Sequence, residues 1–372
     1  MSQVKIQSLT IKGFKTIQQL VAFEPNQINI LIGSNGAGKS NFISFFRMLS
    51  WCVSSVDQFQ NFIADAGFAS SLLFDGAEVT REIEIHLILE TETGLNEYAS
   101  RLVHGAGDIL FFADEKVKFS RRGLPTTNPN WSSLGAGHKE SKLFEFKSTN
   151  STVRTISNLL RKILVYQFHN TSPKSPIRNR WSVNDGRWLK ESGANLGSFL
   201  YRIYQQYPND YKRIVKHIRL VLPFFDDFVL EEERGSVLLR WKEWGSPPKN
   251  FDASQASDGM LRFIAMVALL AQPAEYLPAV LFIDEPELGL HPSAIASMAG
   301  LIKTASRHCQ LFIATQSPTL VDLFESEDIV VVERKENRIS TFKKLNSSEL
   351  KSWLEEYSLS ELWEKNVFGG KP

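Results

Sequence analysis

The chain has 372 residues, of which 43% are hydrophobic and 22% charged, a composition typical of a folded protein with two or three structural units. Its 42 basic and 41 acidic residues leave a net charge of +1, which excludes a uniformly basic nucleic-acid coat. The longest apolar run has nine residues, too few to cross a bilayer, the N-terminus has no signal-peptide core, and two cysteines exclude a disulfide framework. We therefore expect a cytoplasmic protein without membrane association.

The first half of the chain predicts a strand, a glycine-rich loop and a helix, followed by an antiparallel sheet. Alternating hydropathy over residues 4–11 predicts an edge or antiparallel strand. Residues 27–32 predict a short buried strand, and apolar residues at helical spacing between 42 and 49 predict a helix. The strands expected next are 81–90, which alternates strictly, then 109–120 and 143–147, with a mobile loop over 121–139.

The second half predicts a parallel sheet covered by helices. Residues 151–220 look mainly helical, 227–241 look like a hairpin across Arg234 and Gly235, and 257–272 look like one helix. The apolar segments 281–285, 311–315 and 329–333 predict buried strands, separated by helical patterns. This alternation favours an α/β fold with a mainly parallel core sheet.

Residues 33–40 read GSNGAGKS and fit the phosphate-loop pattern G-x-x-x-x-G-K-[ST]. Glycines allow backbone amides to approach phosphate oxygens, and the following helix adds its positive N-terminus. Lys39 would reach the β- and γ-phosphates, and Ser40 would bind Mg²⁺. A glycine turn could match by chance, but the strand–loop–helix context favours a nucleotide site. The expected ATP-binding residues are Gly33, Ser34, Asn35, Gly36, Ala37, Gly38, Lys39, Ser40 and Asn41.

A second strand ends in two carboxylates, in the segment VLFIDE at residues 280–285. Beside the phosphate loop, Asp284 would hold Mg²⁺ through water, and Glu285 would orient or deprotonate the attacking water. The alternative is an ordinary strand with acids at its exposed end. The upstream phosphate loop favours the catalytic interpretation.

Two further segments carry a family resemblance: PELGLHP at 286–292 and ASDGMLR at 256–262. With the phosphate loop and the opening LTIKGFKTI, they resemble ABC-type ATPases of the SMC and RecF-like branch. The chain is most similar to stand-alone bacterial "AAA family" ATPases, which are related to the ATPase half of OLD-family nucleases and to phage-defence ATPases. The resemblance covers both ends of the chain and little of the middle.

This resemblance implies an ABC-type head with an antiparallel β subdomain and an inserted helical lobe. The expected organisation is a first ATPase part over 1–90, a β-arm over 91–150, a basic helical lobe over 151–235, a second ATPase part over 236–345, and a helical tail over 346–372. In the family, two heads close on two ATP molecules, and the signature of one head caps the γ-phosphate held by the other.

Ser257 and Gly259 match the signature Ser and second Gly, while Asp258 replaces the first Gly. Asp258 puts negative charge near the expected anion unless it is turned away or pairs with a base. Alone, the Ser-Asp-Gly sequence is also a common helix cap.

Three more positions are compared with the family pattern. Gln316 stands where transporters have a switch His; it can hydrogen-bond the γ-phosphate or water but cannot carry a proton, or it is a simple strand-end amide. His291 stands where the dimer-contact loop usually has Asp. Gln167 is a candidate for the residue that senses Mg²⁺, with a surface or cap role as the alternative.

Residues 151–220 form a basic module, with 13 Lys and Arg against three acids. Trp181 and Trp188 are interleaved with the cations. The module could bind DNA phosphates while tryptophan stacks on bases, dock an acidic partner or another part of this chain, or form a plain solvated surface.

The sequence therefore predicts a slow, Mg²⁺-dependent ATPase that dimerises on ATP. It would act as a switch in DNA maintenance or phage defence and control a separately encoded effector. One alternative is a transporter ATPase subunit, which the 244-residue spacing from Ser40 to Asp284 disfavours. Another is a nucleotide-gated scaffold with negligible turnover.

Overall fold

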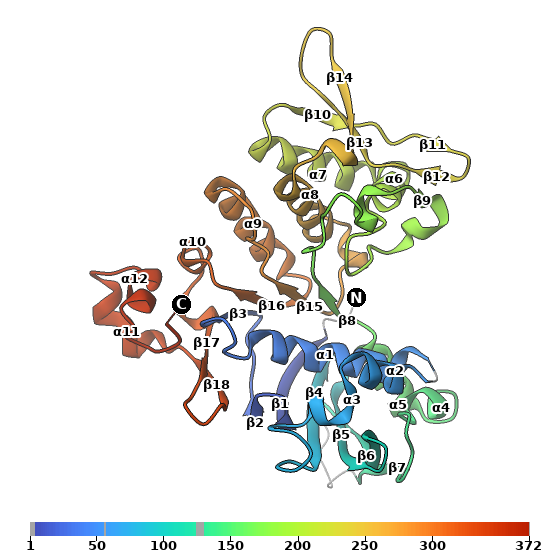
Figure 1. Cartoon of the computed structure of the whole chain (residues 1–372), viewed down its shortest axis with the longest axis vertical. Coiled ribbons are helices and arrows are strands. Elements are labelled where there is room, and N and C mark those ends of the chain that lie inside the picture. Colours follow the sequence, from blue (N-terminus) through green and yellow to red (C-terminus); the bar gives the residue numbers. More distant parts are fainter. Residues whose placement is uncertain (1–3, 56, 124–129, 372) are drawn as a thin grey trace.

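The computed structural model of the chain describes residues 4–55, 57–123 and 130–371. It contains two six-stranded sheets with helices around them and a separate lobe of helices and short strands (Figure 1). Figure 1 places this lobe above the sheets, and the last two helices at the left-hand side. Within the described residues, no helix combines the length and apolar character needed to span a bilayer.

The core sheet is mainly parallel, which confirms the predicted α/β class. Its order is β18-β17-β3-β16-β15-β8, and only the edge strand β18 is antiparallel to its neighbour. All residues of β3 and β15 are buried, as expected of strands covered on both faces. The strands are β3 (Ile28–Ile32), β8 (Ile163–Tyr166), β15 (Val280–Asp284), β16 (Gln310–Thr315), β17 (Ile329–Arg334) and β18 (Ser340–Lys344).

The second sheet is antiparallel, in the order β2-β1-β4-β5-β6-β7. Burial alternates along all ten residues of β4, which agrees with the half-solvated strand predicted there. The strands are β1 (Lys5–Phe14), β2 (Ile17–Phe23), β4 (Glu82–Thr91), β5 (Gly94–Gly105), β6 (Ile109–Arg121) and β7 (Ser132–Gly135).

One strand prediction in this region is wrong. Residues 143–147 do not form a strand, because the edge beside β6 is occupied by β7, and Leu143 is buried on the short helix α4 (Leu143–Phe146) instead. β7 also lies inside the segment predicted as a loop over 121–139, of which residues 124–129 fall outside the described part of the chain.

Helix α1 (Lys39–Ser54) joins the two sheets. Phe42, Phe45 and Phe46 on this helix are fully buried, and Phe46 stacks on Phe282 of the core sheet at 4.3 Å between ring centroids. Nearby are α2 (Gln58–Asp65), α3 (Phe68–Leu72) and α5 (Ser151–Leu160). The buried aromatic face holds α1 in place and thereby fixes the loop at its N-terminus.

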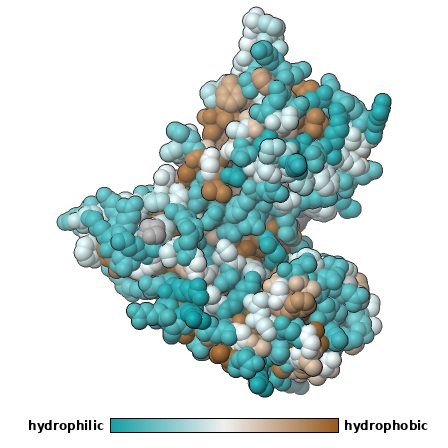
Figure 2. Space-filling view, in the orientation of Figure 1, coloured by the Kyte–Doolittle hydropathy of each residue, from teal (hydrophilic) through white to brown (hydrophobic). Residues whose placement is uncertain are grey.

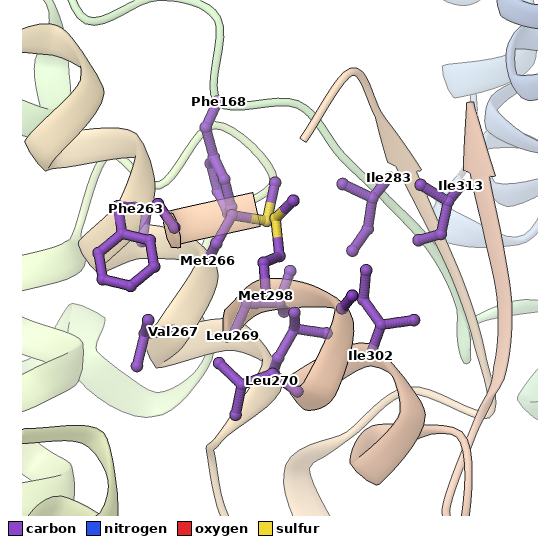
Figure 3. Packing of buried hydrophobic residues seen from close by; sticks show 14 of the residues in the cluster. Phe168, Phe263, Met266, Val267, Leu269, Leu270, Ile283, Met298, Ile302 and Ile313 are labelled. Carbon is purple, nitrogen blue, oxygen red and sulfur yellow. The ribbon is translucent and has the colours of Figure 1, made fainter. Parts of the chain in front are cut away.

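The upper lobe is built on a tightly packed apolar core. Met266 on α8 and Met298 on α9 meet between the two helices, with Ile283 and Ile313 of the core sheet to their right in Figure 3. The helices of this region are α6 (Leu196–Gln206), α7 (Pro208–Val221), α8 (Asp258–Leu270) and α9 (Pro292–Ala305). The C-terminal helices are α10 (Pro318–Val321), α11 (Ser347–Leu354) and α12 (Leu359–Glu364).

Short strands in this lobe differ from the single hairpin expected over 227–241. The turn at Arg234 and Gly235 joins β11 (Glu232–Glu233) to β12 (Ser236–Val237), but β12 also pairs with β9 (Trp181–Ser182). The flanking strand β10 (Phe225–Phe228) pairs with β13 (Arg240–Glu243), which also pairs with β14 (Lys249–Asp252).

The predicted module 151–220 is also less uniform than expected. Besides α5, α6 and α7 it contains β8, which pairs with β15 in the core sheet. Residues 163–166 therefore lie in the core sheet, whereas the sequence predicts a basic helical lobe over 151–235. The four-residue apolar run Ile-Leu-Val-Tyr is too short for its period to distinguish a buried strand from a helix.

Candidate functional site

The phosphate loop lies between β3 and α1, and its glycines are required by their surroundings. A Cβ on Gly33 would lie 2.1 Å from the carbonyl oxygen of Val332, and one on Gly38 would lie 2.2 Å from Ser340 Oγ. Both glycines have positive φ, 152° and 120°. The Ser340 hydroxyl donates to the carbonyl of Ala37 at 2.6 Å, which holds the loop in shape. Asn35, Gly36 and Ser40 are exposed, so this side is open to a ligand.

Lys39 is buried under the loop that it is expected to serve. Its Nζ donates to the carbonyls of Gly33 at 2.5 Å and Ser34 at 3.1 Å. Burial lowers the pKa of Lys39, and the nearby carboxylates of Glu285, Asp284 and Glu287 oppose this shift. The ammonium thus sits among acceptors that a phosphate oxygen could replace.

The predicted phosphate-loop, catalytic and metal-binding residues lie at the ends of four neighbouring parallel strands. In the order β3, β16, β15 and β8, these strands are followed by the phosphate loop, Gln316, the carboxylates and Gln167. The carboxyl ends of parallel strands lie at one edge of a sheet, so residues distant in sequence meet there. This order is the geometric basis of the site.

The two glutamines each contact one of the two carboxylates. Gln167 Nε2 donates to Asp284 Oδ2 at 3.2 Å, and Gln316 Nε2 donates to Glu285 Oε1 at 2.6 Å. Burial, and then the charge of Glu285, raises the pKa of Asp284. A cation would stabilise the charged form of this buried carboxylate, and carboxylate oxygens are among the ligands that Mg²⁺ takes.

Glu285 has an unusual backbone. Its φ is +46°, a left-handed value rarely adopted outside glycine, and its amide donates to the carbonyl of Ala314 at 2.8 Å. This conformation turns the chain at the end of β15 and leaves Glu285 half-buried beside Gln316.

Glu287 is a site residue that the sequence analysis did not identify. Its Oε1 accepts from Thr315 Oγ1 at 2.6 Å and from the amide of Gln316 at 3.0 Å. Its Oε2 is buried without a hydrogen-bond partner in the described part of the chain, and burial raises its pKa. The available signal was a third acid two residues after Glu285, in the sequence DEPE.

The expected signature lies at the start of α8. Ser257 Oγ accepts from the amide of Met260 at 3.2 Å, so Ser257 is the helix cap. A Cβ on Gly259 would lie 2.5 Å from the carbonyl of Gly289, so only glycine fits against the loop after the carboxylates. Within the described residues, no hydrogen bond joins Ser257 or Gly259 to the phosphate loop of the same chain.

Asp258 forms an ion pair with Arg178 at 2.8 Å, so its negative charge is paired with a base. Arg178 is buried and also donates to the carbonyls of Thr171, Ala253 and Ala256. His291 caps α9 through its Nδ1 and contacts Ser293.

Much of the positive charge of the basic module is used inside the chain. Four of its arginines form ion pairs with acids of the same chain: Arg178 with Asp258, Arg180 with Glu233, Arg213 with Asp210, and Arg219 with Asp226. The intramolecular interpretation therefore accounts for these four. Arg161 and Arg202 also donate within the chain, to the carbonyl of Val53 and to the hydroxyl of Tyr276.

Comparison with known proteins agrees with this geometry. The family described as "AAA domain, putative AbiEii toxin, Type IV TA system" matches residues 28–322. The chain is similar to an Smc head bound to the C-winged-helix domain of ScpA, with a TM-score of 0.60, 14% identity, and coverage of 93% of this chain and 99% of that one. It is also similar to a Pyrococcus furiosus-derived Smc head with an extended coiled coil, at a TM-score of 0.57 and 14% identity, with coverage of 95% of this chain and 99% of that one. No curated protein matches the sequence.

Proposed function

The chain belongs to the AAA-domain family that matches it, within the ABC- and SMC-like P-loop ATPases, and we propose that it is an ATP-driven switch whose two heads close on two ATP molecules. The observation that carries the proposal is the pair Gln316–Glu285, 2.6 Å apart at the strand ends beside the phosphate loop. A base and an amide in contact there are suited to holding an attacking water.

Each residue has a role in this scheme. Lys39 exchanges its loop carbonyls for β- and γ-phosphate oxygens, and the loop amides bind the same phosphates. Ser40 and Asp284, with Gln167 beside them, are the residues that would hold Mg²⁺, which supplies charge neutralisation on the phosphates. Glu285 accepts the proton of the attacking water, and Gln316 orients that water.

The second head is proposed to complete the site. Ser257 and the α8 N-terminus form an exposed helix end suited to an anion, and among the described residues neither donates to nor accepts from the phosphate loop of the same chain. Arg178 pairs with Asp258 at this end. In the single head, Glu285 accepts a hydrogen bond from Gln316, so both side chains have to bind the attacking water before the reaction can begin. Both features support slow turnover until a partner head binds.

We place the switch in phage defence, with control of a separately encoded effector, rather than in transport. The family description, which names a toxin of a toxin–antitoxin system, supports this choice. DNA binding through the unpaired cations of 151–220 would make ATPase stimulation by duplex DNA fade as salt rises.

The test is the variant Glu285→Gln, which removes the base and keeps the shape of the side chain. We expect it to bind ATP, to lower turnover by about 10²-fold or more, and to accumulate dimers in ATP and Mg²⁺. Light scattering after size-exclusion chromatography measures the dimer, and Lys39→Ala, which loses phosphate contacts, is the control that stays monomeric. Finding only monomers of Glu285→Gln at saturating ATP would contradict the two-head mechanism.

A further inference from the structure

A cavity of about 920 Å³ opens where the upper lobe meets the edge of the core sheet at β8, and no residue of the phosphate loop lines it. Its walls come from the end of α5 and the start of β8 on one side and from residues 184–191 and 275–278 on the other. Figure 2 shows the molecule hollowed on its right-hand side between the upper and lower lobes. The volume lies within the range of ligand pockets, roughly 300–1,000 Å³.

One wall of the cavity is aromatic, and a buried residue, Asn195, fixes the loop that carries it. Trp188 is 53% exposed, and its ring meets the edge of Tyr276 at 5.2 Å. Asn195 is fully buried; its Nδ2 donates to the carbonyls of Asp185 and Trp188, and its Oδ1 accepts from the amide of Lys190. The loop carrying Trp188 is therefore fixed by three hydrogen bonds, so the exposure of this large ring is built into the fold.

Several charged side chains line the cavity, and of these Arg161 donates to the carbonyl of Val53 while Lys190 lies 3.8 Å from the centroid of the Trp181 ring. Lys162, Arg187 and Lys190 line it, and in the part of the chain that the structure describes none of them forms an ion pair. The same holds for the carboxylates of Asp185 and Glu191 on the rim. All five of these charged side chains are exposed, so a ligand in the cavity can contact them without breaking an intramolecular ion pair.

We infer that this cavity binds one unpaired nucleotide unit, at a site separate from the ATP site. Each group present matches one part of such a ligand. The rings of Trp188 and Tyr276 suit the face of a base, the cations suit a phosphate, and the carboxylates accept from base amino groups. The unit could come from a free nucleotide or from a single strand; the bases of a duplex are stacked and do not enter.

The cavity is connected to the proposed Mg²⁺ site by a short path. Tyr166 Oη donates to the carbonyl of Leu189 at 3.0 Å, and the amide of Gln167 donates to the carbonyl of Glu191 at 3.0 Å. Gln167 then contacts Asp284. A ligand that moves the 188–191 wall therefore moves Gln167, and this coupling, unlike the binding itself, rests on the proposed function.

Binding is measured in a Lys39→Ala background, which removes the ATP site and separates this test from the failure of the ATPase proposal. The probes are fluorescein-labelled oligothymidylate of about 20 nucleotides, a duplex of the same length, and unlabelled UMP and AMP as competitors. We expect Trp188→Ala to weaken oligothymidylate binding about tenfold and Trp188→Phe to retain it. Trp244→Ala is the matched control, since Trp244 is 61% exposed but does not line the cavity.

The outcomes separate the sources of the ligand. Competition by UMP or AMP that Trp188→Ala abolishes assigns a free nucleotide; binding of the strand alone assigns single-stranded nucleic acid. Three results would overturn the proposed site: tighter binding of the duplex, equal losses of affinity in Trp188→Ala and Trp244→Ala, or no binding of any probe at about 50 mM salt. The cavity would then be assigned to an apolar side chain of a partner protein. In the chain with Lys39 intact, ATP turnover that ignores a bound oligonucleotide would overturn the coupling through Gln167.

Discussion

At the scale of single residues, the geometry of the site depends on the hydrogen bonds of Glu287 as well as on Asp284 and Glu285. Glu287 ties the loop after β15 to the end of β16 through Thr315 and the amide of Gln316. Gln316 in turn contacts Glu285. No hydrogen bond in the described chain joins Glu287 to the phosphate loop. We therefore assign it to positioning the glutamine rather than to binding ATP.

Replacing Glu287 by Ala should lower kcat about tenfold and leave KM for ATP nearly unchanged. The lost bonds to a charged acceptor hold Gln316 in place, and a tenfold rate effect corresponds to about 1.4 kcal/mol. Glu287→Gln keeps an acceptor oxygen and should stay within about twofold of the natural chain. Steady-state kinetics check both variants. An increase in KM with unchanged kcat would show that Glu287 acts in binding instead.

At the scale of elements, Arg178 joins the start of α8 to the segment that follows Gln167. Its guanidinium donates to four carbonyls and to Asp258. The Arg178 side chain is 6% exposed, whereas that of Asp258 is 56% exposed. Arg178 is thus a buried residue that connects several backbone segments, and Asp258 is its solvent-exposed partner.

This asymmetry predicts unequal effects on stability. Arg178→Lys should lower the free energy of unfolding by about 2–4 kcal/mol, because lysine cannot reproduce the fork and leaves buried carbonyls unpaired. Asp258→Ala should cost less than about 1 kcal/mol, since its carboxylate is largely solvated. Urea denaturation measures both. Equal losses would mean that the ion pair, and not the carbonyl contacts, carries the interaction.

Elements of local origin could be predicted from the sequence, and those built by distant contacts could not. The phosphate loop, the strand ending in Asp284 and the position of Gln316 follow from short patterns with fixed geometry. The pairing of Asp258 with Arg178 spans 80 residues, and no pattern in either segment indicates it. Likewise the sequence predicts a helical lobe where β8 lies, because only the pairing with β15 identifies its four apolar residues as a strand. The cavity at Trp188 needs both lobes and has no sequence signature.

At the scale of the whole molecule, the C-terminal segment packs beside the phosphate loop. Ser360 on α12 donates to Asp322 just after α10, and the Trp363 indole donates to the carbonyl of Gly370. A Cβ on Gly370 would lie 3.8 Å from the Cα of Gly33 and 2.6 Å from Val331 Cγ1. The segment over residues 359–371 therefore connects the strand end that carries Gln316 with the first glycine of the loop.

Two adjacent glycines allow this contact to be tested. Gly369 and Gly370 have φ values of +89° and +68°, so alanine is strained at either position. At Gly370 the added methyl group would lie 2.6 Å from Val331 Cγ1 on β17, beside Gly33. At Gly369 the nearest atoms are the carboxylate oxygens of Glu333, also on β17, at an ordinary contact distance of 3.6 Å. The strain is common to both variants, and the difference between them reports the contact with the loop.

We expect Gly370→Ala to raise KM for ATP about fivefold or more relative to Gly369→Ala, with similar melting temperatures for the two. The physical reason is that the methyl group displaces Val331, the neighbour of Val332, whose carbonyl oxygen lies against Gly33. Titration with a fluorescent ATP analogue measures affinity directly, and calorimetry checks the fold. If both variants bind ATP equally well, the segment only covers β17, and the geometry of the phosphate loop is set by β3, α1 and Ser340 alone.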